Sequence, residues 1–300
     1  MNNGGRRFGT PHIGIIASML VFGTVGVVRR FVLFPSGFTA MLRGFIGALV
    51  IGLFMLVTRK RLNLPAIKAN AVRLILSGVF IGVNWILLFE AFNYTTIAVA
   101  TVCYYLAPIF VIIISPIALG ERIGAVRGSA VVLALVGAVV VSEPWADGFV
   151  GGKDLIGVLL AVGAAVFYAG VTVLNKKMRD IPSLDMTLVQ LAVAATVVLP
   201  YTLIAEPIEP KMFEITTVLL VILLGAVHTG GAYLFYFSAV NRLPAATSAI
   251  FSYIDPLFAV ILSALVLREP FTVFSALGAL IILGATLISE LFGDLRKKKG

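Results

Sequence analysis

The chain has 300 residues, of which 60% are hydrophobic and only 12% are charged, with a formal net charge of +9. A soluble globular domain carries about twice that fraction of charged residues, so this composition argues against a soluble protein. The basic excess would suit nucleic acid, but the cations gather in separate loops between apolar stretches, which argues against a nucleic-acid partner.

Ten apolar stretches follow one another along the chain, each of the length needed to cross a bilayer, about 20 residues. They span 12–34, 36–57, 74–92, 97–117, 125–142, 154–174, 184–204, 215–239, 245–267 and 271–291. Backbone polar groups cannot stay unpaired in lipid, and barrel strands would be about half this length. The sequence therefore predicts an all-α integral membrane protein with ten transmembrane helices.

The Lys and Arg residues fall mostly on one face of this predicted bundle. Clusters lie at 59–73, between the second and third spans, at 176–179, after the sixth span, and at 296–299. Cytoplasmic loops are enriched in such residues. We therefore expect a multi-pass plasma-membrane protein with both termini in the cytoplasm, and with residues 1–11 and 292–300 as cytoplasmic tails.

The sequence contains an internal repeat, in which 89–121 aligns with 237–269 at a constant offset. Polar and special residues recur in register, which chance matches among apolar residues would not produce. They include Asn93 and Asn241, Tyr105 and Tyr253, Pro108 and Pro256, Ser115 and Ser263, and Glu121 and Glu269. We assign the halves to 12–142 and 154–291. Because each half holds five spans, an odd number, the second half would be inverted in the membrane, as is common in secondary transporters.

The doubled segment, from Asn93 to Glu121 and again from Asn241 to Glu269, resembles the EamA-type drug/metabolite transporters, as does Arg43 early in the second span. The resemblance implies two inverted five-helix repeats around a central cavity. It also implies carriage of small organic solutes, above all amino acids or their derivatives, commonly by export. Sugar-phosphate and nucleotide-type exchangers belong to the same superfamily and form the alternative, although no basic cluster lies deep in the second half.

Ionisable residues inside the spans are costly and need a reason. Arg43 and Glu90 are predicted at similar depth, where they would either bind substrate or form a permanent ion pair. Asp255 replaces Ala107 of the first half, so it breaks the repeat. With His228, we consider it a candidate proton-coupling group; the alternative for His228 is a hydrogen bond to a carbonyl of a neighbouring helix.

Aromatic and amide side chains within the spans are further candidates for substrate binding, since they can stack on a solute or bond to it. They are Asn84, Trp85, Tyr104, Tyr168, Gln190, Tyr233 and Tyr253. The alternatives are core packing for the aromatic residues and interhelical hydrogen bonds for the amides.

Motifs for other classes of function are not found in the sequence. It has no HExxH, GxSxG or P-loop motif and no Cys/His cluster, so we expect no enzymatic activity, no metal and no cofactor. A membrane-embedded enzyme or a receptor remains as a second alternative. We therefore predict a secondary active transporter, a monomer or homodimer, whose partners are a small-molecule substrate and the lipid bilayer, with proton coupling as an option.

Overall fold

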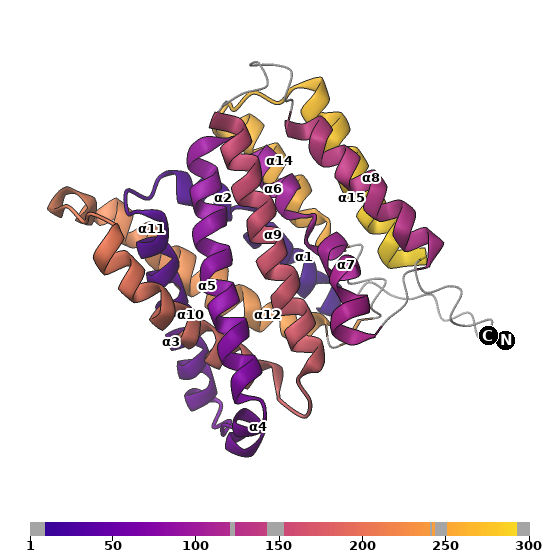
Figure 1. The fold of residues 1–300 in the computed structure, drawn as a ribbon. Helices are drawn as coiled ribbons and strands as arrows, with labels where there is room; N and C mark the ends of the chain where they lie inside the picture. The colour runs from indigo at the N-terminus through magenta and orange to yellow at the C-terminus, as the bar shows by residue number, and fades with distance from the viewer. Residues whose placement is uncertain (1–9, 121–123, 143–152, 241, 244–250, 293–300) are drawn as a thin grey trace.

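The computed structural model describes residues 10–120, 124–142, 153–240, 242–243 and 251–292, and within these ranges the regular structure is entirely helical (Figure 1). In the first half the helices are α1 (Thr10–Gly23), α2 (Val25–Arg30), α3 (Ser36–Val57), α4 (Leu64–Ala69), α5 (Ala71–Tyr94), α6 (Ile97–Tyr104), α7 (Ala107–Leu119) and α8 (Ala125–Ser142). In the second half they are α9 (Lys153–Lys177), α10 (Ser183–Ala205), η1 (Pro210–Phe213), α11 (Ile215–Gly225), η2 (Ala226–Gly231), α12 (Ala232–Val240), α14 (Ile254–Val266) and α15 (Val273–Phe292). The predicted tails lie largely outside the described residues.

The apolar helices follow the ten predicted spans. In the part of the chain that the structure describes, seven helical stretches are long and apolar enough to cross a membrane: Thr10–Arg30, Ser36–Val57, Ala71–Tyr94, Ile97–Leu119, Asp154–Lys177, Ser183–Ala205 and Ile215–Ala239. Three more are apolar but shorter: Ala125–Val140, Ile254–Val266 and Val273–Ser289. The predicted fold class, an all-α membrane protein, is confirmed.

Several spans are less regular than predicted. The first helical stretch ends at Arg30 rather than at residue 34, and Pro35 disfavours helix at Phe34, the residue directly before it. The fourth span breaks between α6 and α7, and Pro108 lies in the first turn of α7, where its missing N–H costs nothing. The eighth span contains the π-helix η2, a form that often marks functional sites.

The packing of the helices is repeated when the two halves are exchanged. Helices α5 and α7 of the first half pack on α9 of the second half. In the same way, α12 and α14 of the second half pack on α1 of the first half. The last helices of the two halves, α8 and α15, lie side by side at the right of Figure 1. This is the arrangement expected of two related five-helix units.

A close crossing of α3 and η2 depends on glycine. A Cβ atom added to Gly47 would lie only 2.6 Å from the Thr229 side chain. The absence of a side chain therefore lets α3 approach η2 closely, and it brings Thr229 within reach of Arg43, one helical turn before Gly47 on α3.

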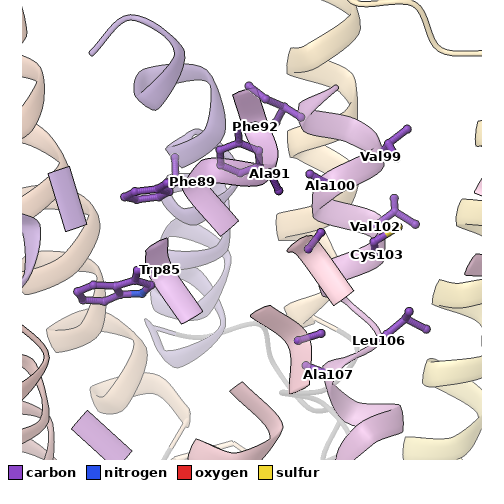
Figure 2. Close-up of a cluster of buried hydrophobic side chains, with 14 of the residues drawn as sticks. Trp85, Phe89, Ala91, Phe92, Val99, Ala100, Val102, Cys103, Leu106 and Ala107 are labelled. Carbon is purple, nitrogen blue, oxygen red and sulfur yellow. The ribbon is translucent and has the colours of Figure 1, made fainter. Parts of the chain in front are cut away.

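The core beside the bundle centre is formed by α5 with α6 and α7. Figure 2 shows Trp85, Phe89 and Phe92 on α5, and Cys103 among the small side chains of α6. Cys103 is fully buried, as expected of a small apolar filler. This packing fixes the face of α5 that carries Trp85.

Candidate functional site

A cavity of about 680 Å³ lies between the two halves, and described helices of both halves contribute to its lining. We call the end of the bundle with Arg30 and Glu269 the gate end, and the opposite end, with Arg73 and Lys177, the basic end. The lining extends to Lys176, an exposed residue at the basic end. The volume lies within the range usual for small-molecule sites.

All but two of the predicted site residues line this cavity. The predicted residues that line the cavity are Arg43, Asn84, Trp85, Tyr104, Tyr168, Gln190, Tyr233, Tyr253 and Asp255. Their roles as substrate or proton contacts stay predictions. Glu90 and His228 do not belong to the lining.

Arg43 is a buried cation of the cavity lining, and the residue is 5% exposed. Its guanidinium carbon lies 4.6 Å from the Trp85 ring centroid, and its Nε donates to Thr229 Oγ1 at 2.7 Å. A desolvated cation–π contact contributes about 2 kcal/mol, which offsets part of the cost of burying the charge. Among the described residues no other hydrogen bond of this guanidinium is found, so its terminal nitrogens are available to a ligand.

Asp255, in the first turn of α14, is the acid of the cavity. Its carboxylate accepts a hydrogen bond from the Tyr105 hydroxyl at 2.9 Å, and that hydroxyl also approaches the Ser252 carbonyl at 3.1 Å. Within the described ranges no ion pair joins Asp255 to a cation. The cavity therefore combines an unpaired acid with Arg43.

The two amides hold helices together as well as facing the cavity. Asn84 Nδ2 donates to the Ala164 carbonyl at 2.6 Å, which joins α5 to α9. Gln190 Nε2 donates to Ser77 Oγ and to Asn175 Oδ1, both at 2.7 Å. These contacts match the interhelical alternative of the sequence analysis, and a role toward substrate would fall to the amide oxygens.

Aromatic rings form two groups along the cavity. Tyr104 lies 5.6 Å from Tyr168, and Tyr105 lies 6.2 Å from its repeat counterpart Tyr253. On the other side, Tyr233 of α12 lies 5.6 Å from Phe22 of α1. The distances are between ring centroids and are typical of aromatic pairs, so the rings present an ordered, amphipathic surface to a ligand.

The predicted ion pair between Arg43 and Glu90 is not formed. The Glu90 carboxylate instead accepts hydrogen bonds from Ser36 Oγ at 2.8 Å and Asn93 Nδ2 at 3.1 Å. Equal depth along two helices places residues at one level of the membrane, but it does not orient them toward each other. Glu90 faces the start of α3, and Arg43 faces α5 and η2.

His228 is 3% exposed and is held within the helix packing. Its Nε2 lies 2.7 Å from Thr24 Oγ1, and its Nδ1 lies 3.1 Å from the Leu223 carbonyl oxygen. The expected carboxylate neighbour is thus replaced by a hydroxyl and a helix carbonyl. The π-helix η2 turns this side chain toward α1 instead of into the cavity.

The two halves are tied together at the gate end by carboxylates of the second half. Glu269 forms an ion pair with Arg30 at 2.9 Å and accepts from the Ile97 N–H, at the start of α6, at 2.8 Å. Glu206 accepts from the N–H groups of Gly37 and Phe38, both at 2.7 Å, at the start of α3. A carboxylate is favoured at a helix N-terminus, so both contacts stabilise the packing of the two halves at this end.

Some residues of the site are missing from the sequence-based set. Tyr105 bonds Asp255, and Arg127 and Lys176 line the cavity toward the basic end. The internal repeat aligns Tyr105 with Tyr253. Because Tyr253 was predicted to bind substrate, the alignment could have indicated Tyr105 as a further site residue. Arg127 and Lys176 appear in the sequence only as loop-proximal cations.

Comparisons with known proteins agree on the class of this chain. The model of the EamA-like transporter family matches residues 10–143 and again 155–290. The uncharacterized transporter YxxF of Bacillus subtilis (strain 168) is 24% identical over 84% of this chain and 80% of its own length. An uncharacterized transporter of Archaeoglobus fulgidus is 26% identical over 92% of this chain and 94% of its own. A crystal structure at 19% identity covers 95% of this chain and 99% of its own with a TM-score of 0.67, which shows a shared fold.

Proposed function

The chain belongs to the EamA-like transporter family, and from this premise we propose that it is a secondary active transporter of a small organic metabolite. The observation that carries the proposal is the form of the cavity. Its lining reaches an exposed residue at the basic end, while carboxylates tie the two halves together at the gate end. A site between two repeats, with contacts between the halves at one end that can break and re-form, is what alternating access requires.

The chemistry of the lining suits an amino acid or a derivative of one. The available nitrogens of Arg43 can bind a carboxylate, which guanidinium recognises through two parallel hydrogen bonds. The tyrosine rings can cover an organic side chain. Asp255 offers a negative charge for an ammonium group, or a carrier for a proton.

The direction that we propose is export from the cytoplasm across the plasma membrane, coupled to proton entry. The basic end carries the clustered cations that mark cytoplasmic loops, so the cavity opens toward the cytoplasm. A solute loaded there would be released when the gate end opens. Asp255 would take up a proton from outside in exchange, and the transporter acts as a monomer or homodimer.

Flux measurements in proteoliposomes test the proposal. Purified protein would be reconstituted and counterflow of labelled amino acids, amino-acid derivatives, sugar phosphates and nucleotides measured, with Arg43→Gln protein as the control for specific binding. We expect counterflow of at least one carboxylate-bearing solute, lost in the control. Flux of phosphorylated solutes alone would favour the exchanger alternative, and absence of flux and binding across the whole panel would refute the transporter proposal.

A further inference from the structure

A second hollow, of about 860 Å³, lies at the basic end, outside the central cavity. It is formed where the α4–α5 corner meets the end of α7 and the connection from α9 to α10. Its charged lining consists of Arg73, Lys176, Lys177, Arg179 and Asp180. Among the described residues of its lining, four cations therefore stand against one acid, which makes this part of the hollow positive.

Among the described residues, no ion pair neutralises the cations of this hollow. Across the described ranges the ion pairs are Arg30–Glu269 and Lys211–Glu209, both elsewhere. The Asp185 carboxylate accepts a hydrogen bond from the N–H of the lining residue Asn63 at 2.8 Å, and among the described residues it forms no ion pair with these cations. Uncompensated cations repel one another, so an anion in the hollow would relieve a standing electrostatic cost.

The frame of the hollow is built in advance. Asn70 is 4% exposed, and its Nδ2 donates to the Ala66 carbonyl at 2.9 Å and the Arg179 carbonyl at 3.0 Å. This one side chain joins the α4–α5 corner to the chain that follows α9. The contact holds Arg179 near the start of α5, where Arg73 lies.

The two helices that contribute Arg73 and Ala118 to the lining also carry exposed apolar side chains, which we call the apolar border of the hollow. Val72, next to Arg73 on α5, is 71% exposed, and Ile117, next to the lining residue Ala118 on α7, is 92% exposed. Both lie in helical stretches that are apolar enough to span a bilayer. A ligand with a charged head and an apolar body would match both parts of this surface.

We propose that this hollow binds the phosphate headgroup of an anionic phospholipid from the inner leaflet. Basic pockets between helices at the cytoplasmic side are suited to such headgroups. A free phosphate would use the cations but would leave the exposed apolar border unoccupied. Lys176 lines both this hollow and the central cavity, so the bound lipid would lie beside the mouth of the transport site.

Native mass spectrometry of the full-length protein in detergent, titrated with phosphatidylglycerol, measures this binding without any transport step. The test variant is Arg73→Gln/Lys177→Gln/Arg179→Gln, which spares Lys176. The matched control, Arg59→Gln/Lys60→Gln/Arg61→Gln, removes three exposed cations that do not line the hollow. Each cation near an anionic lipid contributes roughly a fivefold factor, so we expect binding to weaken on the order of 100-fold in the test variant and to persist in the control.

Further titrations in the same experiment identify the ligand. Phosphatidylcholine, which carries no net charge, should bind no more tightly to wild type than to the test variant. Equal weakening by both triple variants would overturn the proposal, because it would show a general attraction to the basic end. Equal competition by free glycerol phosphate would also overturn it in favour of a soluble ligand. A second variant, Asn70→Ala, keeps every cation and should weaken binding by a smaller factor through loss of the frame.

Discussion

Arg43 is held by its Nε and by the Trp85 ring in a way that leaves its terminal nitrogens available. Lysine would keep the charge, but it would lose the planar fork, the bond to Thr229 and the stacking on Trp85. We therefore expect Arg43→Lys to raise the KM for carboxylate-bearing solutes roughly tenfold or more, with little effect on neutral ones. Counterflow in proteoliposomes with matched pairs of solutes and their amides measures this difference.

Thr229 provides the control for this prediction, because it bonds Arg43 but is fully buried and does not belong to the cavity lining. Thr229→Ser keeps the hydroxyl and should behave as wild type, whereas Thr229→Val should share part of the carboxylate-specific loss. Equal loss for neutral and charged solutes in the Arg43 and Thr229 variants would assign Arg43 a structural role.

Asp255 is an acid without an ion-pair partner among the described residues, and it is the basis for the coupling prediction. Asp255→Asn keeps an oxygen acceptor for the Tyr105 hydroxyl but cannot exchange a proton. We expect this variant to lose transport driven by a proton gradient and to retain solute exchange. Tyr105→Phe keeps the carboxylate and should retain driven transport. An unchanged dependence of Asp255→Asn transport on pH would contradict the coupling role.

At the scale of the elements, the close crossing of α3 and η2 predicts that a glycine-to-alanine substitution at the crossing lowers stability more than the same substitution elsewhere on α3. Gly47→Ala would bring a Cβ within 2.6 Å of Thr229, whereas at Gly52, on the same helix, the nearest side chain would be 4.0 Å away. Overpacking costs about 1–3 kcal/mol. We expect Gly47→Ala to lower the Tm in detergent by several degrees, and Gly52→Ala to leave it unchanged or raise it. Equal Tm values would mean that the helices separate without cost.

The spans could be predicted from the sequence because hydropathy and length directly express the cost of placing a segment in lipid. Their breaks could not be located in the same way. The first helical stretch ends at Arg30, and the eighth span contains the π-helix Ala226–Gly231. Both features depend on local backbone hydrogen bonding inside apolar sequence, and a hydropathy average does not detect such bonding. Pro108 signalled one break, since proline has a specific backbone requirement.

The sequence could predict those features of the candidate site that depend on the depth of a residue in the membrane and on the internal repeat. Asp255 was identified because it departs from the repeat, and it lines the cavity. The partners of each polar residue were not predictable, because they depend on the rotation of each helix about its axis. Glu90 and His228 show this: both lie within spans, but each faces a neighbouring helix end or carbonyl instead of the cavity.

For the whole molecule, the two halves meet differently at the two ends of the cavity. At the basic end the lining reaches exposed Lys176, and at the gate end Glu269 and Glu206 hold the starts of α6 and α3. Each of these carboxylates joins one half to the other. Under the proposed alternating-access mechanism such contacts would break and re-form, so their strength would affect the balance between the two states.

We therefore expect the strength of the ion pair between Arg30 and Glu269 to determine how readily the gate end opens. Its side chains are 41% and 8% exposed, so one partner is largely shielded from water. Removing about 1–2 kcal/mol from one state changes the ratio of two states roughly 5–30-fold. We expect Glu269→Gln and Arg30→Gln each to increase the population that is open at the gate end.

Cysteine labelling measures this population. In a Cys103→Ala background, Thr101→Cys would place a thiol in the cavity lining on α6, and a membrane-impermeant maleimide would be added from the gate end. We expect labelling to be several times faster in both gate variants. Lys211→Gln is the matched control, since it removes a surface ion pair with Glu209 whose side chains are 73% and 50% exposed, and such pairs contribute little. Labelling rates that are equal in all variants would show that opening of this end does not depend on the Arg30–Glu269 contact.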